Sequence, residues 1–267
     1  MNRRLLLQTL RWNRVRLVAL MLVAFGWGIL MPVIYASFSG PLKQLANSGT
    51  IPKQLFNFGS GSVFTLPGVL TLGLQHPLAI AFIGIFAVGS TVGAIAGERE
   101  RGTLEVLLAR PLPRRALYVT IGVAVLIMIS LVLVALLLGQ MTGVALERLG
   151  GELDLAQMPL VFVNGLLLWG AFAAFGLAAS VSFDRLAPAL GLTMAYLLIN
   201  YFLEILGSLW RDVAWSQQYS LFHHFNPGNI LTGKADLFDF VLLAAAIVIP
   251  VAYALVVFPR RDLAAPS

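Results

Sequence analysis

Few side chains in this sequence could carry out chemistry, and the most suggestive are two adjacent histidines, His223 and His224. Neighbouring histidines can ligate a metal ion, but a stable site needs further ligands, and the chain has no cysteine to supply them. Alternatively, the two histidines belong to an aromatic cap over one end of the fold, which is the outer end if the chain spans a membrane. The serines at 208, 216 and 220 lack the G-x-S-x-G spacing of a serine nucleophile. The sequence therefore predicts no catalytic residue and no metal site.

Two further motifs that would indicate an enzyme are absent from the sequence. It contains neither H-E-x-x-H, which binds zinc, nor G-x-x-x-x-G-K-[ST], whose backbone amides hold nucleotide phosphates. We therefore expect no cofactor in this chain and no ATP hydrolysis by it. If ATP and Mg²⁺ are used, a separate subunit must bind them.

The most unusual stretch is GERERGTLEVLLARPLPRR at residues 97–115, which places eight charged side chains in nineteen positions. Gly102 is expected to end the preceding helix, and Thr103 to cap a new one whose first turn contains Glu105. The leucines at 104, 107 and 108 fall on one side of that helix, and Pro111 stops it after about two turns. The pattern predicts a short amphipathic helix between two charged clusters.

Two interpretations of this helix are open from spacing alone. It could be a positively charged loop that only fixes topology and rests on lipid headgroups. It could instead be a docking helix, whose leucines fill a groove of a partner protein while the charges set the register.

The stretch resembles the E…GTLE-x-LL-x-x-P-x-x-R signature of ABC type-2 permeases, the membrane subunits of ATP-binding-cassette exporters. The resemblance implies a coupling helix between the second and third spanning helices, seated in a cleft of a cytoplasmic ATPase. The positions that match are Glu98, Gly102, Thr103, Leu104, Glu105, Leu107, Leu108, Pro111 and Arg114. It also implies a short N-terminal helix on the membrane surface, for which a plain basic arm is the alternative.

Composition identifies the elements that must hold this stretch. Hydrophobic residues make up 59% of the 267-residue chain and charged residues only 11%, against about 25% in soluble domains. About 20 apolar residues cross a bilayer as a helix. We predict an all-α integral membrane protein, a single permease domain over 1–267, with helices at about 17–38, 77–97, 116–146, 159–183, 186–210 and 240–258 and a coupling loop at 98–115.

The distribution of basic residues predicts the orientation. With a cytoplasmic N-terminus, thirteen of the eighteen lysines and arginines lie inside and five lie outside, as the positive-inside rule requires. Both termini are then cytoplasmic, in what we expect to be a bacterial plasma membrane. The net charge of +6 thus needs no nucleic-acid partner. The inner set is Arg3, Arg4, Arg11, Arg14, Arg16, Arg99, Arg101, Arg110, Arg114, Arg115, Arg185, Arg260 and Arg261.

Three features inside the apolar segments invite a role. Gly89, Gly93 and Gly97 recur at four-residue spacing, which lets a neighbouring helix approach closely. This face could serve packing alone, or it could transmit a movement of the 98–115 loop to the packed helices. Glu204 is the only charge within a predicted span, either on a transport pathway or at the outer headgroups. The apolar stretch 63–74 could lie on the outer membrane surface.

These observations favour the permease subunit of an ABC exporter, which couples ATP hydrolysis in a separate ATPase to substrate movement. The resemblance implies a second permease copy or a paralogue as a partner, together with membrane lipid. An ATPase-linked scaffold or assembly factor without transport is the alternative. No motif in the sequence identifies a substrate.

Overall fold

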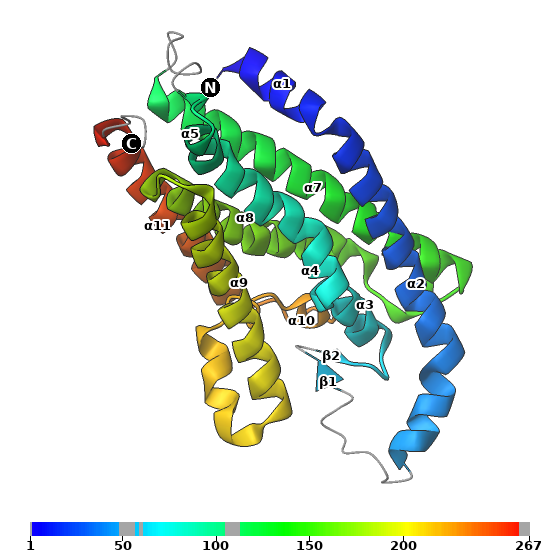
Figure 1. Ribbon diagram of the computed structural model, residues 1–267. Helices are drawn as coiled ribbons and strands as arrows, with labels where there is room; N and C mark the ends of the chain where they lie inside the picture. The colour runs from blue at the N-terminus through cyan, green and yellow to red at the C-terminus, as the bar shows by residue number, and fades with distance from the viewer. Residues whose placement is uncertain (1, 48–56, 59–60, 105–112, 262–267) are drawn as a thin grey trace.

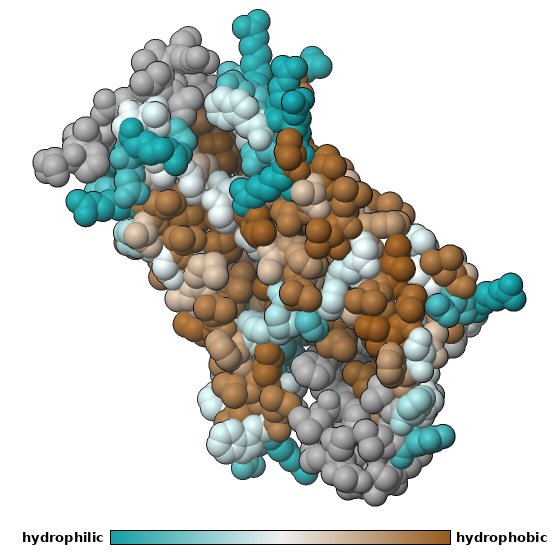
Figure 2. All heavy atoms as spheres, turned by 45° about the vertical axis from the view of Figure 1, so that its right-hand side comes forward, coloured by the Kyte–Doolittle hydropathy of each residue, from teal (hydrophilic) through white to brown (hydrophobic). Residues whose placement is uncertain are grey.

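The computed structural model describes residues 2–47, 57–58, 61–104 and 113–261. These residues form a bundle of long helices (Figure 1). Five helices are long and apolar enough to cross a membrane, and a bent helix pair makes a sixth if it is counted as one span. The face in Figure 2 has a broad apolar band with polar side chains concentrated towards its two ends. The predicted all-α integral membrane fold is confirmed.

Five long helices correspond to predicted spans. The first, α2 (Arg14–Asn47), extends well beyond the predicted end at 38 and contains Pro32 and Pro41. The other four match their predictions closely because apolar composition and helix length are both strong signals. They are α7 (Arg114–Leu146), α8 (Met158–Ser182), α9 (Leu186–Leu209) and α11 (Leu237–Arg260).

Short elements connect these helices at the end away from the termini. Strands β1 (Asn57–Phe58) and β2 (Gly61–Ser62) pair antiparallel, with the first residue of β1 opposite the last of β2. The remaining connections are single helical turns or short helices: η4 (Gly150–Glu152), η5 (Leu155–Gln157), η6 (Arg211–Tyr219) and α10 (Pro227–Leu231).

The second span differs from the single helix predicted over 77–97. It begins as α3 (Leu66–Gln75), bends by 47° at His76 and continues as α4 (Pro77–Gly84). Two π-helical stretches follow, η2 (Ile85–Ser90) and η3 (Gly93–Gly97), before the short α5 (Glu98–Glu100). Most of α3 is buried, so the prediction that residues 63–74 could lie on the membrane surface is wrong.

Polar side chains from neighbouring helices stabilise this irregular span. The amide of Gln140 on α7 donates to the Leu70 carbonyl at 2.9 Å, and the Trp27 indole on α2 donates to Gly73 at 2.9 Å. On η3, the Ser180 hydroxyl of α8 accepts from two backbone amides and donates to a carbonyl at 2.8 Å. Such inserted groups satisfy backbone positions that a π-helical turn leaves out of the regular ladder.

The closest helix packing lies between α2 and α7, and other glycines create it. A Cβ atom added at Gly139 would lie 2.1 Å from the Phe25 carbonyl oxygen, and one at Gly28 would lie 2.3 Å from that of Leu136. Only glycine allows backbones to approach so closely.

The predicted packing stripe on the second span is not a close contact within this chain. A Cβ at Gly93 would meet nothing within 4 Å, and Cβ atoms at Gly89 and Gly97 would meet only side chains, at 3.4 Å and 3.7 Å. Four-residue spacing places these glycines near one another, but spacing alone does not place a neighbouring helix beside them.

Both termini lie at the same end of the bundle (Figure 1). The N-terminal helix α1 (Arg3–Trp12) is capped by Asn2, whose backbone amide donates to the Thr120 hydroxyl on α7 at 2.9 Å. Leu5 and Leu10 are partly buried against the core, while Trp12 is exposed. A helix at the N-terminus is therefore present, and its position on a membrane surface stays a prediction.

Candidate functional site

The charged stretch begins with α5, which ends at Glu100 and is closed by Gly102, consistent with the prediction that Gly102 breaks the helix. Gly102 has a φ of 69°, a left-handed conformation that glycine adopts without strain. Its amide donates to the Arg99 carbonyl at 2.9 Å, and the Thr103 amide donates to the Glu98 carbonyl at 2.9 Å. These two bonds form a Schellman motif, which satisfies carbonyls at the end of the helix. The chain therefore turns sharply at the start of the stretch.

The Glu98 carboxylate holds this turn together. It accepts a hydrogen bond from the Thr103 hydroxyl at 2.6 Å and forms an ion pair with Arg101. Thr103 thus bonds backwards to the preceding helix. The helix that Thr103 is predicted to cap begins at Leu104, and its remaining positions lie outside the described residues.

Leu104 is buried within the chain. Its side chain is 2% exposed and belongs to the apolar core of the chain, so it does not have the exposed position that the sequence predicts, and its docking role stays a prediction. Its burial anchors the start of the stretch to the bundle. The predicted docking positions Glu105, Leu107, Leu108 and Pro111 lie outside the described residues.

An ion-pair network joins this turn to two other helices. Arg99, whose side chain is 9% exposed, lies 2.7 Å from the half-exposed Asp184 carboxylate in the turn between α8 and α9. Arg261, at the C-terminal end of α11, pairs with the same carboxylate and also donates to the Val181 carbonyl. One acid therefore links α5, the α8–α9 turn and the end of α11.

Two further contacts attach the stretch at helix ends. Glu100 accepts from the Leu186 amide at 2.9 Å, which places a carboxylate at the N-terminus of α9, where the helix dipole favours negative charge. At the other end of the stretch, Arg114 donates to the carbonyls of Phe258 and Arg261 at 3.3 Å and 2.6 Å. Arg114, predicted to take part in docking, thus caps the C-terminus of α11.

Both flanks of residues 105–112 are therefore bonded to the ends of other helices. A displacement of the stretch would pull on α9 through Glu100, on the α8–α9 turn through Arg99 and on α11 through Arg114. We call this group of contacts the junction: Glu98, Arg99, Glu100, Arg114, Asp184 and Arg261.

A second feature lies between α9 and the second span. Here the structure has a groove of about 470 Å³. Its walls are apolar except for Arg16 and Tyr201. By sequence Arg16 is one of the basic residues at the inner end, and its contact with Ile85 on η2 has no signal in residue spacing.

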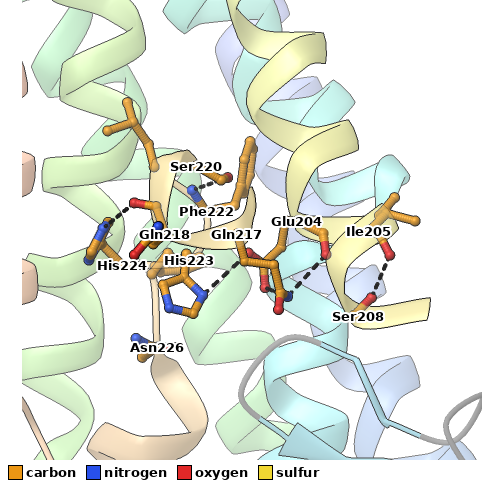
Figure 3. Close-up of polar contacts among 12 residues, drawn as sticks. Glu204, Ile205, Ser208, Gln217, Gln218, Ser220, Phe222, His223, His224 and Asn226 are labelled. Carbon is orange, nitrogen blue, oxygen red and sulfur yellow. Dashed lines mark hydrogen bonds and ion pairs between the residues drawn. The ribbon is translucent and has the colours of Figure 1, made fainter. Parts of the chain in front are cut away.

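Glu204 lies outside this groove, against the connection between α9 and α10. Its side chain is buried and accepts from the Gln217 amide at 3.1 Å, and its second oxygen lies 3.6 Å from the His223 ring. Figure 3 shows Gln217 and His223 directed towards Glu204 on α9. Glu204 is thus not among the groove residues, and it joins η6 and the following loop to α9. Its position relative to the headgroups stays a prediction.

The two histidines contact different carboxylates. His224 lies 2.7 Å from Asp239 at the start of α11, whereas His223 is paired with Glu204. Among the residues that the structure describes, no three potential metal ligands gather at one point. The loop is also held by Asn164, whose amide donates to the His224 carbonyl at 3.1 Å. These contacts support the interpretation of the histidines as part of a cap on one end of the bundle, and its location on the outer side of the membrane stays a prediction.

The pairing with Glu204 predicts a measurable pKa. The Glu204 carboxylate beside its ring raises the pKa of His223 above its usual 6.5, and the negative charge of Asp239 adds to the effect. The stability from protonated His223 is therefore complete below about 6.5 and is lost as pH rises through the raised pKa. We expect Glu204→Gln to lower the His223 pKa, as followed by NMR of ring protons in detergent micelles, with Glu147→Gln as the control. An unchanged pKa would contradict the pairing.

Apolar helices of spanning length define this chain as an integral membrane protein of several crossings, with a charged junction at one end. The chain belongs to the ABC-2 family of transporter proteins, whose family model matches residues 10–263. It is therefore a membrane permease component of an ABC-type transporter, and the predicted resemblance is confirmed. No curated protein matches the chain.

Proposed function

We propose that this chain is the permease subunit of an ABC exporter and that residues 98–115 are the docking segment for a separate cytoplasmic ATPase. The observation that carries the proposal is the junction, which bonds both flanks of this segment to the ends of α9 and α11. Closure of the ATPase would move the segment, and these bonds would transmit the movement to the spanning helices. The proposal that transport runs outwards rests on the resemblance of residues 98–114 to the signature of ABC exporter permeases.

The remaining assignments follow from the same proposal. The end of the bundle that carries the junction and both termini faces the cytoplasm of a bacterium, and ATP and Mg²⁺ are bound by the ATPase. Two permease chains, identical or paralogous, pair with two ATPase subunits. The groove beside α9 favours a transport role over a scaffold role, because a scaffold needs no such space within the spanning region.

Substitution of the two remaining leucines tests docking. We expect Leu107→Asp combined with Leu108→Asp to reduce capture of the ATPase by the affinity-tagged chain at least about tenfold, because two buried leucines contribute ~3 kcal/mol or more to an interface. The ATPase is identified in the captured material by the peptide that contains its phosphate-binding loop. Leu104 is left intact because it is a core residue.

The matched control is Leu155→Asp, an exposed leucine at the opposite end of the bundle, which should capture the ATPase normally. Capture by the double variant at the level of the unsubstituted chain would contradict the proposal. ATP-dependent substrate movement in reconstituted vesicles would then separate an exporter from a scaffold.

A further inference from the structure

The groove between α9 and the second span has the form of a site for a long, thin apolar molecule. One wall is formed by α4 and η2 from Pro77 to Gly89, and the other by α9 from Leu190 to Tyr201. At 1.5 Å per residue each wall is about 17 Å long, close to half of the ~30 Å hydrocarbon layer of a bilayer. An alkyl chain of one membrane leaflet fits these dimensions.

A single positive charge lies towards one end of this apolar space. The Arg16 guanidinium of α2 donates to the Ile85 carbonyl at 2.9 Å, and its central carbon lies 5.0 Å from the centre of the Phe86 ring. A Cβ added at Gly89 would meet only this guanidinium, at 3.4 Å. The exposed arginine side chain therefore contacts the second span beside the groove.

The guanidinium has more hydrogen-bonding capacity than this contact uses. It carries five N–H donors, and the Ile85 carbonyl takes one of them. Among the described residues, no carboxylate forms an ion pair with Arg16. Arg16 lies in the first turn of α2 and its side chain is exposed, at the end of the groove where a lipid headgroup would lie. Its remaining donors can therefore meet a negatively charged ligand there.

We propose that the groove binds an anionic phospholipid that enters from the surrounding bilayer, with its phosphate on Arg16 and one acyl chain along the apolar walls. Phosphate accepts two parallel hydrogen bonds from a guanidinium, which makes arginine a suitable partner. A second copy of this chain fits less well, because the only acid within the predicted spans is Glu204, which is buried against Gln217. If the chain is an exporter as proposed above, this lipid class is also its candidate substrate.

Photolabelling of the purified full-length chain in a nonionic maltoside detergent tests the site. Two probes carry the same photoreactive acyl chain, one on phosphatidylglycerol and one on diacylglycerol, which lacks the phosphate. We expect the phosphatidylglycerol probe to label peptides from 77–89 and 190–201 at least about tenfold more strongly than the diacylglycerol probe. Hydrogen bonds between the phosphate and a charged guanidinium strengthen binding enough for that ratio.

Three variants separate the headgroup from the tail. Arg16→Gln should reduce phosphatidylglycerol labelling to the level of diacylglycerol, and Arg16→Lys should keep most of it. Arg14→Gln, which removes the same charge two residues away on an exposed side chain, should have no effect. Ala81→Trp, which fills the groove and leaves Arg16 intact, should reduce labelling by both probes.

Equal labelling by the two lipids, or full labelling of Arg16→Gln, would overturn the proposal. Protection of the groove by a second copy, detected as labelling that appears only on dilution to the monomer, would also overturn it. The groove variants should still capture the ATPase, whereas loss of docking in the leucine variants leaves lipid labelling unchanged, so failure of either proposal is visible separately.

Discussion

Replacing Gly139 by alanine is expected to lower the midpoint of thermal unfolding in detergent by about 10 °C. The added Cβ would lie 2.1 Å from the Phe25 carbonyl oxygen, and the obstacle is backbone, which cannot rotate away. The helices α2 and α7 must separate, and overpacking of this kind costs ~3 kcal/mol. In a chain of this size each kcal/mol shifts the midpoint by roughly 2–4 °C.

Gly26→Ala is the matched control on the same helix pair. A Cβ at Gly26 would meet nothing within 4 Å, and alanine is a better helix former than glycine, so the midpoint should stay the same or rise slightly. The same temperature for both variants would show that α2 and α7 are not in close backbone contact.

Replacing Asp184 by alanine is expected to reduce ATP-driven transport at least about tenfold while the ATPase remains bound. The substitution removes the carboxylate that Arg99 and Arg261 share, so the docking segment loses its ionic link to the α8–α9 turn and to α11. Arg99 is buried, and separating a buried charge from its partner is strongly unfavourable. Transport per ATP hydrolysed, measured in reconstituted vesicles of the complete complex, is the appropriate quantity.

Glu147→Ala provides the control, because Glu147 is an exposed acid at the opposite end of α7. It should leave transport unchanged. Loss of ATPase capture by Asp184→Ala would assign the residue to docking, and unchanged transport would remove the junction from the mechanism.

The spanning helices could be predicted because hydropathy and length act over some twenty residues at once. That signal predicts four helices correctly: α7, α8, α9 and α11. The helix end just before Gly102 could be predicted because glycine adopts the left-handed backbone conformation without strain. The bend at His76 and the π-helical turns could not be predicted, since they depend on groups such as Ser180 that come from other helices.

The individual site residues were harder to assign for the same reason. Leu104 has the spacing of a docking leucine, yet contacts within the chain bury it. Gly93 has the spacing of a packing glycine, yet the neighbouring helix lies elsewhere. Arg16 is one of thirteen arginines at the inner side by charge pattern, and only its contact with Ile85 sets it apart.

The position of the two chain ends fixes the parity of the crossings. A polypeptide that starts and finishes on one side of a bilayer must traverse it an even number of times. If each of the five long helices crosses once, an even number requires the bent pair of α3 with α4 and η2 to cross once as well, and we expect it to do so. Reporter domains fused to either end would therefore signal from the same compartment.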